Sequence, residues 1–225
     1  MFLANNNLHI VAVSDWVGGQ VKKSFLSNKD IRVIPNGINL NVFRSLSKSE
    51  TDCMYEGKFI ILAVASQWKS GKGFEDYIAM SSLLKDDELI VLVGVDEKIK
   101  KSLPDNIVGI SRTNSQSELV SLYSRADVVT SFSSAETFGL TIVEAFACGT
   151  PVVAYNNTAQ AILINEDTGY LVPTGDYSAA YQAIQSIREK GKQFYFDACQ
   201  RLVAESYGEK QCTEKYVNLY NEILK

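Results

Sequence analysis

The chain has 225 residues, which is enough for one large domain or for one domain with appendages. Hydrophobic residues make up 46% and charged residues 21%, which is ordinary for a globular protein. The net charge of −4 argues against a nucleic-acid-binding protein, because such a protein would present a basic face.

The few cysteine and histidine residues argue against a metal centre and against several hydrolase mechanisms. His9 is the only histidine, and no two cysteines have the C-x-x-C spacing of a zinc site. A Ser-His or Cys-His pair would have only His9 as its base, so nucleophilic hydrolysis is not expected. We expect small buried thiols in a reducing compartment, at Cys53, Cys148, Cys199 and Cys212.

No segment of the sequence predicts a membrane anchor. No apolar run reaches the ~18–20 residues that a membrane span needs. Residues 1–14 lack the basic start and the long apolar core of a signal peptide. The sequence therefore predicts a cytoplasmic protein with no membrane span.

Short β-branched segments alternate with helical segments through most of the chain. Strands are expected at residues 9–14, 31–34, 58–65, 88–94, 106–110, 127–132, 151–155 and 169–173. Helices are expected at residues 15–26, about 74–84, 115–126, from about 139 onward, 177–190 and in two stretches up to 225. Ser115 and Asp176 are expected to cap two of these helices. The alternation predicts an α/β fold with a doubly wound parallel sheet, whose ligands bind at the carboxyl ends of the strands.

One boundary interrupts this pattern. Residues 44–57 are polar and patternless, and we interpret them as a linker. They separate residues 1–43 from a main body at 58–208. A single strand–helix unit does not cover its own apolar face, so residues 1–43 are predicted to be the remnant of another domain or an appendage.

The segment "AETFGLTIVEAFACGTPVVA" (135–154) carries two acids in apolar surroundings. Glu136 falls in the loop that enters the helix, and Glu144 projects from a helix that is apolar on every side. An ionised carboxylate there is costly unless it is paired or hydrogen-bonded. A ribose diol could give Glu144 two hydrogen bonds, and the helix start could bind phosphate. The alternative is that Glu144 pairs with an internal lysine or arginine and that Glu136 is an ordinary N-terminal acid. The pattern alone leaves both open.

Four motifs in the same order resemble one enzyme family. They are the segment above, "VIPNGINLNVF" (33–43), "LAVASQWKSGKGFEDYI" (62–78) and "NEDTGYLVPTGD" (165–176). Together they resemble the retaining nucleotide-sugar glycosyltransferases of GT-B architecture, the Glu-x7-Glu family of glycosyltransferase group 1. The resemblance implies that residues 58–208 form the Rossmann-like, nucleotide-sugar-binding C-terminal half of a GT-B fold.

The resemblance also implies roles for single residues around the two acids. Glu144 would hold the ribose hydroxyls, and Glu136 would contact the hydroxyls of the donor sugar. The backbone amides of Phe138, Gly139 and Leu140 would face the sugar and the diphosphate at the helix start.

Further roles fall on the other motifs. Lys72 would stabilise the negative charge that develops on the diphosphate leaving group, and Gly73 would let the backbone approach phosphate. The alternative for Lys72 is a solvated loop lysine. Gln67 stands where the family usually has an arginine, which leaves either weakened catalysis or a variant cation arrangement with Lys69 or Arg112. Arg112 lies where the family reads the nucleotide base.

No cofactor beyond the nucleotide sugar and no metal is expected, because the sequence has no Asp-x-Asp motif. It also lacks the P-loop and G-x-G-x-x-G patterns. In the loop after residue 155, Ala161 and Ile162 replace the family's Pro-Glu, and we assign no ligand role to that loop.

The resemblance implies the donor-binding half of an enzyme that moves a hexose-type sugar from a nucleoside diphosphate, with UDP favoured, to an unidentified acceptor. The alternative is a non-catalytic nucleotide-sugar-binding or interaction module. We expect the chain to bind a nucleotide but to turn over poorly without an acceptor-binding N-terminal domain. The last helix, residues 209–225, would then need another partner for its apolar face. We predict that this face packs on residues 1–43 or on a second copy of the chain, through Val217, Tyr220, Ile223 and Leu224.

Overall fold

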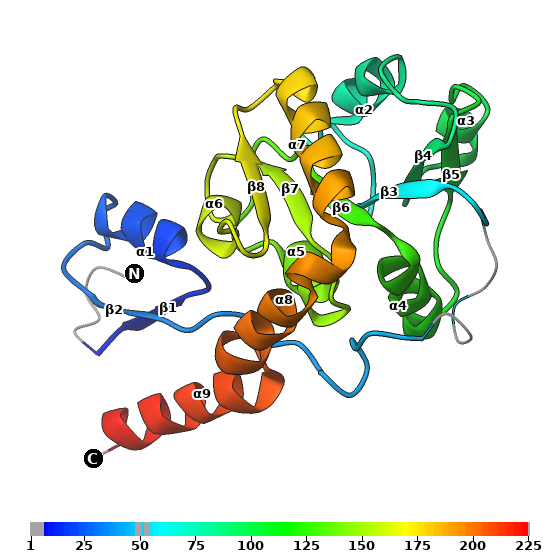
Figure 1. The fold of residues 1–225 in the computed structure, drawn as a ribbon. Coiled ribbons are helices and arrows are strands. Elements are labelled where there is room, and N and C mark those ends of the chain that lie inside the picture. Colours follow the sequence, from blue (N-terminus) through cyan, green and yellow to red (C-terminus); the bar gives the residue numbers. More distant parts are fainter. Residues whose placement is uncertain (1–6, 48–50, 52–54, 225) are drawn as a thin grey trace.

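The computed structural model describes residues 7–47, 51 and 55–224. Its core is a six-stranded sheet in which every neighbouring pair of strands is parallel. The strands are β3 (Phe59–Val64), β4 (Glu88–Val93), β5 (Ile107–Ile110), β6 (Val128–Ser131), β7 (Val152–Tyr155) and β8 (Gly169–Val172). Their order along the sheet is β5-β4-β3-β6-β7-β8 (Figure 1), so the predicted doubly wound parallel sheet is confirmed.

The strand order reverses between β3 and β6. The chain builds outward from β3 through β4 to β5, and then returns to place β6 on the other side of β3. At such a reversal the loops that follow the two neighbouring strands diverge, and a crevice opens outside their carboxyl ends. The topology therefore fixes where a ligand site can form.

Helices cover both faces of the sheet. They are α2 (Phe74–Ser81), α3 (Glu97–Lys100), α4 (Gln116–Arg125), α5 (Leu140–Ala147), α6 (Gln160–Leu163), α7 (Tyr177–Lys190) and α8 (Lys192–Ser206). In Figure 1, α2 and α7 lie together over one face, whereas α4, α5 and α8 pack on each other over the opposite face. The central strands therefore contact apolar groups on both sides, and every residue of β4 is buried.

Most predicted elements are present, with ends that differ by a few residues. The helix predicted at 15–26 is shorter and ends at Lys22, and the helix predicted at 74–84 ends at Ser81. The short helices α3 and α6 were not predicted, because four residues are too few to show a helical period. The two predicted caps are confirmed. Ser115 Oγ accepts a backbone N–H from the first turn of α4, and the side chain of Asp176 accepts one from the first turn of α7.

A small βαβ unit lies beside the main body (Figure 1). Strands β1 (His9–Ala12) and β2 (Asp30–Val33) pair in parallel, and α1 (Asp15–Lys22) connects them. The unit touches the main body where Ser14 Oγ donates to the carbonyl of Thr137 at 2.7 Å. Part of the predicted linker, residues 48–50 and 52–54 with Cys53, lies outside the described residues.

The predicted packing of the last helix, α9 (Glu209–Ile223), on residues 1–43 is wrong for its apolar face. The side chains of that face are 50%, 58%, 39% and 84% exposed, in the order Val217, Tyr220, Ile223 and Leu224. The residues that this helix buries are instead Cys212 and Leu219. Packing by a second copy of the chain stays a prediction.

Residues 1–43 meet α9 through other groups. Arg32 pairs with Glu222, with Nη2 2.7 Å from Oε1. The chain also passes close to the start of α9 at Gly37, where a Cβ atom would lie 2.7 Å from the Cα of Glu209. Only a glycine allows this approach.

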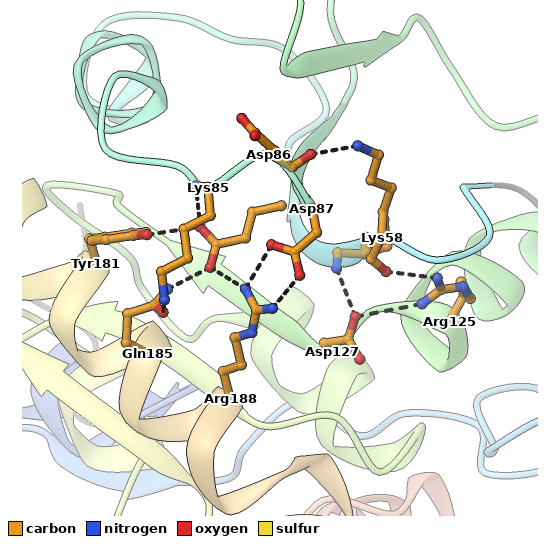
Figure 2. A network of polar contacts seen from close by, with 11 residues as sticks. Lys58, Lys85, Asp86, Asp87, Arg125, Asp127, Tyr181, Gln185 and Arg188 are labelled. Atoms are coloured by element: carbon orange, nitrogen blue, oxygen red, sulfur yellow. Dashed lines mark hydrogen bonds and ion pairs between the residues drawn. The ribbon is translucent and has the colours of Figure 1, made fainter.

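A polar network ties α7 to the amino-terminal end of β4. Figure 2 shows Tyr181, Gln185 and Arg188 of α7 converging on the start of this strand. All three side chains donate to the buried carboxylate of Glu88, at 2.8, 2.7 and 2.6 Å respectively. Burial alone would raise the pKa of Glu88, but these bonds and the N–H of Lys85 hold it below its ordinary value. This end of the sheet is far from the carboxyl ends of the strands, so the network is structural.

Three cysteines can be placed in the described part of the chain. Cys148, Cys199 and Cys212 are free and buried, and burial raises the pKa of the first two thiols to about 12. None of the helices in the described ranges is long and apolar enough to cross a membrane.

Candidate functional site

A cavity of about 360 Å³ opens at the carboxyl ends of β3 and β6. The loops that follow these strands and the first turns of α5 form its walls. Six of the nine predicted site residues line this cavity, namely Lys72, Glu136, Phe138, Gly139, Leu140 and Glu144. Residues that are up to 72 positions apart in sequence therefore come together at the reversal of strand order.

Glu144 faces the cavity from the second turn of α5. The buried Tyr123 hydroxyl donates to Glu144 Oε2 at 2.8 Å. Burial raises the pKa of Glu144 to about 6, and the bond from Tyr123 opposes that rise. Within the described part of the chain, no lysine or arginine pairs with this carboxylate, so the alternative of an internal cation is wrong. Tyr123 thus holds one oxygen of a carboxylate whose side chain lines the cavity.

The start of α5 is suited to an anion. Gly139 precedes the helix with φ of +105°, a left-handed conformation that glycine adopts without strain. None of the described side chains forms a capping hydrogen bond at this helix start. Free backbone N–H groups at the start of a helix, together with the positive end of its dipole, attract phosphate.

Lys72 and Glu136 form an ion pair at the mouth of the cavity. Lys72 Nζ lies 2.5 Å from Glu136 Oε1, and the two side chains are 36% and 22% exposed. The loops that carry them are joined, because the N–H of Ser134 donates to the carbonyl of Gly71 at 2.8 Å. The pairing shows that Lys72 is not simply a solvated loop lysine. Lys72 could bind a diphosphate, and Glu136 could bind a sugar hydroxyl.

The other three predicted residues do not line the cavity. Gln67 and Arg112 are exposed on the surface. Gly73 begins α2 with φ of +73°, and a Cβ atom there would lie 2.5 Å from the carbonyl oxygen of Phe132. The structural need for glycine at position 73 is thus the close contact with the end of β6.

Two residues that form hydrogen bonds with the predicted acids were not predicted from the sequence. Tyr123 holds Glu144, and Thr158 Oγ1 accepts the backbone N–H of Glu136 at 2.9 Å. Neither had a local signal, because Tyr123 fits the apolar face of α4 and Thr158 lies in the loop to which no role was assigned. Among the residues that the structure describes, no cluster of three or more His, Cys, Asp or Glu side chains could hold a metal ion.

Known proteins resemble this chain in sequence and in fold. The family model "Glycosyl transferases group 1" matches residues 58–205. A probable sucrose-phosphate synthase of Thermosipho melanesiensis is 31% identical over 208 residues, covering 84% of this chain and 47% of that protein.

Solved structures share the fold. The sucrose-phosphate synthase of Thermosynechococcus elongatus has a TM-score of 0.84 at 24% identity, over 95% of this chain and 58% of that one. The Anabaena protein HepE, in complex with UDP and glucose, has a TM-score of 0.79 at 17% identity, over 95% of this chain and 62% of that one. This chain therefore spans 47% to 62% of the length of these three proteins.

Proposed function

Because this chain belongs to the group 1 glycosyl transferases and has the C-terminal half of their GT-B fold, we propose that its cavity binds a nucleoside diphosphate sugar. In this proposal the chain is the donor-binding half of a glycosyltransferase that moves a hexose-type sugar to an acceptor with retention. UDP is the proposed carrier. The Anabaena structure with UDP and glucose supports that choice, because it has the same fold.

The observation that carries the proposal is the environment of Glu144. Its half-buried side chain lines the cavity at the reversal of strand order, and within the described ranges no lysine or arginine pairs with its carboxylate. A buried carboxylate of this kind needs hydrogen-bond donors to stay ionised. The two hydroxyls of a ribose supply such donors in the geometry that a carboxylate accepts.

The remaining groups fit the rest of a nucleotide sugar. The free amides at the start of α5 would receive the diphosphate. Lys72 would then leave Glu136 for the diphosphate, where its charge stabilises the negative charge that grows as the glycosidic bond breaks. Glu136, released from Lys72, would accept hydroxyls of the sugar.

Substitution of Glu144 tests this function. Glu144→Ala removes two charge-assisted hydrogen bonds to the ribose and is expected to cost roughly 3–6 kcal/mol of UDP affinity, which is at least a hundredfold. Titration calorimetry with UDP measures the loss. Glu189→Ala, at an exposed position of α7, is the matched control and should bind UDP like the wild type. UDP binding that is unchanged in Glu144→Ala would contradict the proposal.

A non-catalytic nucleotide-sugar-binding module is the second candidate function. The observation that favours it is Gln67, which is exposed and outside the cavity, where the family usually has an arginine. The proposed partner for catalysis is an acceptor-binding N-terminal domain, with a second copy of the chain as the alternative, and a cytoplasmic location stays a prediction. Hydrolysis of UDP-glucose by a protein that joins this chain to such a domain would favour the enzyme, and binding without hydrolysis would favour the module.

A further inference from the structure

Thr158 has an unusual backbone conformation next to the candidate site. Its φ is +44°, in the left-handed region, where a β-branched side chain is strained. Among the described residues, Tyr55 is the one other non-glycine residue with a positive φ, and it lies in the turn before β3. Backbone strain of this kind persists only where the surroundings hold it, and it is concentrated at functional sites.

The strained residue holds the backbone of Glu136 on both sides. Thr158 Oγ1 accepts the N–H of Glu136 at 2.9 Å, and the N–H of the next residue, Ala159, donates to the carbonyl of Glu136 at 3.2 Å. The hydroxyl hydrogen of Thr158 is directed to Asn157 Oδ1 at 3.1 Å, which leaves a lone pair for Glu136. Two consecutive residues therefore hold both peptide units that flank the Cα of Glu136 in the loop after β6.

A second layer of bonds holds the same segment three and five residues before Glu136, at Ser133 and Ser131. The carbonyl of Ser133 accepts from Asn157 Nδ2 at 3.1 Å and from Gln160 Nε2 at 3.0 Å. Gln160 is fully buried, and its Oε1 accepts the hydroxyl of Ser131 at 2.9 Å. Residues 157–160, here called the Thr158 clamp, thus connect the start of α6 to the whole path from β6 to Glu136.

We propose that Thr158 is a positioning residue, whose strained backbone and hydroxyl place the Glu136 carboxylate against the sugar of the donor. The inference rests on the proposed function, because it takes Glu136 as the group that contacts the sugar. With the left-handed turn at position 158, the side chain of Thr158 and the N–H of Ala159 reach the two backbone polar groups of the same residue, Glu136. The Thr158 clamp touches Glu136 and not Glu144, so it acts on sugar recognition and not on the nucleotide.

Three variants separate the effect of the Thr158 hydroxyl from effects on the fold. Thr158→Val keeps the shape and the β-branch but removes the hydroxyl, and Thr158→Ser keeps the hydroxyl. Thr174→Val is the matched control, because the Thr174 hydroxyl likewise bonds to Asn157, by accepting from its Nδ2, but does not touch Glu136. The readouts are the dissociation constants for UDP and for UDP-glucose, and the hydrogen exchange rate of the Glu136 amide in the free chain.

The wild type is expected to bind UDP-glucose more tightly than UDP. In Thr158→Val that ratio should fall about fivefold, as for the loss of one hydrogen bond, while the affinity for UDP changes less than about twofold. Exchange of the Glu136 amide should also become faster. Thr158→Ser and Thr174→Val should keep the wild-type ratio and exchange rate.

The outcomes distinguish this inference from the proposed function. If the wild type does not bind UDP, the proposed function fails and the inference falls with it. If UDP binds but the wild type shows no preference for UDP-glucose, or if Thr158→Val keeps the wild-type ratio, only the inference is overturned. Equal losses of UDP and UDP-glucose in Thr158→Val would also overturn it, because they would indicate a purely structural role.

Discussion

At the scale of single residues, the chemistry of the site depends on which partner each acid has. Glu136 is paired with Lys72 and keeps a charge partner in the free protein. Among the residues that the structure describes, Glu144 has only the hydroxyl of Tyr123 as a side-chain partner, and burial raises the pKa of Glu144 to about 6. The two acids therefore have partners of different kinds, although they stand eight residues apart in one motif.

The raised pKa of Glu144 predicts that the proposed binding of UDP depends on pH and on Tyr123. Wild-type affinity for UDP should fall as the pH drops below about 6, because protonated Glu144 no longer accepts two hydrogen bonds. Tyr123→Phe removes the bond that lowers the pKa of Glu144, so the fall should begin at a higher pH. At pH 7, Tyr123→Phe should bind UDP about tenfold more weakly than the wild type does. Calorimetric titration with UDP between pH 5 and 8 measures both effects.

The control for Tyr123 is Tyr220→Phe, since Tyr220 is 58% exposed on α9 and distant in sequence from the site. This variant should reproduce the wild-type profile. A UDP affinity that is the same at pH 5 and pH 8 would refute the assigned role of the Glu144 carboxylate.

At the scale of elements, the two ends of the parallel sheet serve different purposes. Loops and a helix start with free amides surround the cavity at the carboxyl ends of the strands. At the amino-terminal end, the network around Glu88 locks α7 onto β4 (Figure 2). Polar groups near the cavity remain available to a ligand, whereas those of the network satisfy each other.

Removal of Glu88 should destabilise the fold without direct effect on the site. Glu88→Ala removes the acceptor of Tyr181, Gln185 and the N–H of Lys85 and one of the two acidic partners of Arg188, and we expect a loss of about 3 kcal/mol in the free energy of unfolding. For a chain of this size the melting temperature should fall by roughly 6–12 °C. Calorimetric melting measures this, with Glu189→Ala as the exposed control on α7.

The network around Glu88 also predicts how the stability of the fold changes with pH. The pKa of Glu88 is lowered in the folded state, so its contribution to stability is present above its unfolded pKa and is lost as the pH falls through the folded value. Wild-type stability should therefore decrease below about pH 4, and Glu88→Ala should show a shallower decrease there. Equal pH slopes in the two proteins would contradict this account.

At the scale of the whole molecule, ligand binding in the cavity and the stability of the fold are thermodynamically linked. A ligand that binds only the folded chain stabilises it, by about 2.7 kcal/mol at a hundredfold excess over its dissociation constant. UDP at that concentration should raise the melting temperature by roughly 5–10 °C. Glu144→Ala should show no such shift at the same concentration of UDP, as measured by differential scanning fluorimetry. A missing shift in the wild type would favour an interaction module without a nucleotide ligand.

The family match covers the main body of the chain and leaves out the parts beside it. The six-stranded sheet lies within the matched residues 58–205, and the small βαβ unit and α9 lie outside them. The chain spans about half to three fifths of the proteins that it resembles, and the apolar side chains of α9 are exposed. A partner that covers α9 stays a prediction, whether it is a further domain or a second copy.

The sequence by itself determined the order and type of the elements and most of the candidate site. Alternating β-branched and amphipathic segments are set by neighbours within about ten residues, so periodicity and caps such as Ser115 and Asp176 could be predicted locally. The two acids of residues 136 and 144 stood out because carboxylates are rare in an apolar helix and its entry loop.

Only the tertiary structure decided which distant groups these residues meet. The partners Lys72, Tyr123 and Thr158 come from three other segments, and the strand order β5-β4-β3-β6-β7-β8 brings them to Glu136 and Glu144. Packing likewise turned the expected apolar face of α9 toward solvent. Contacts across the fold depend on the path of the whole chain and on close packing, and no local pattern of residues encodes them.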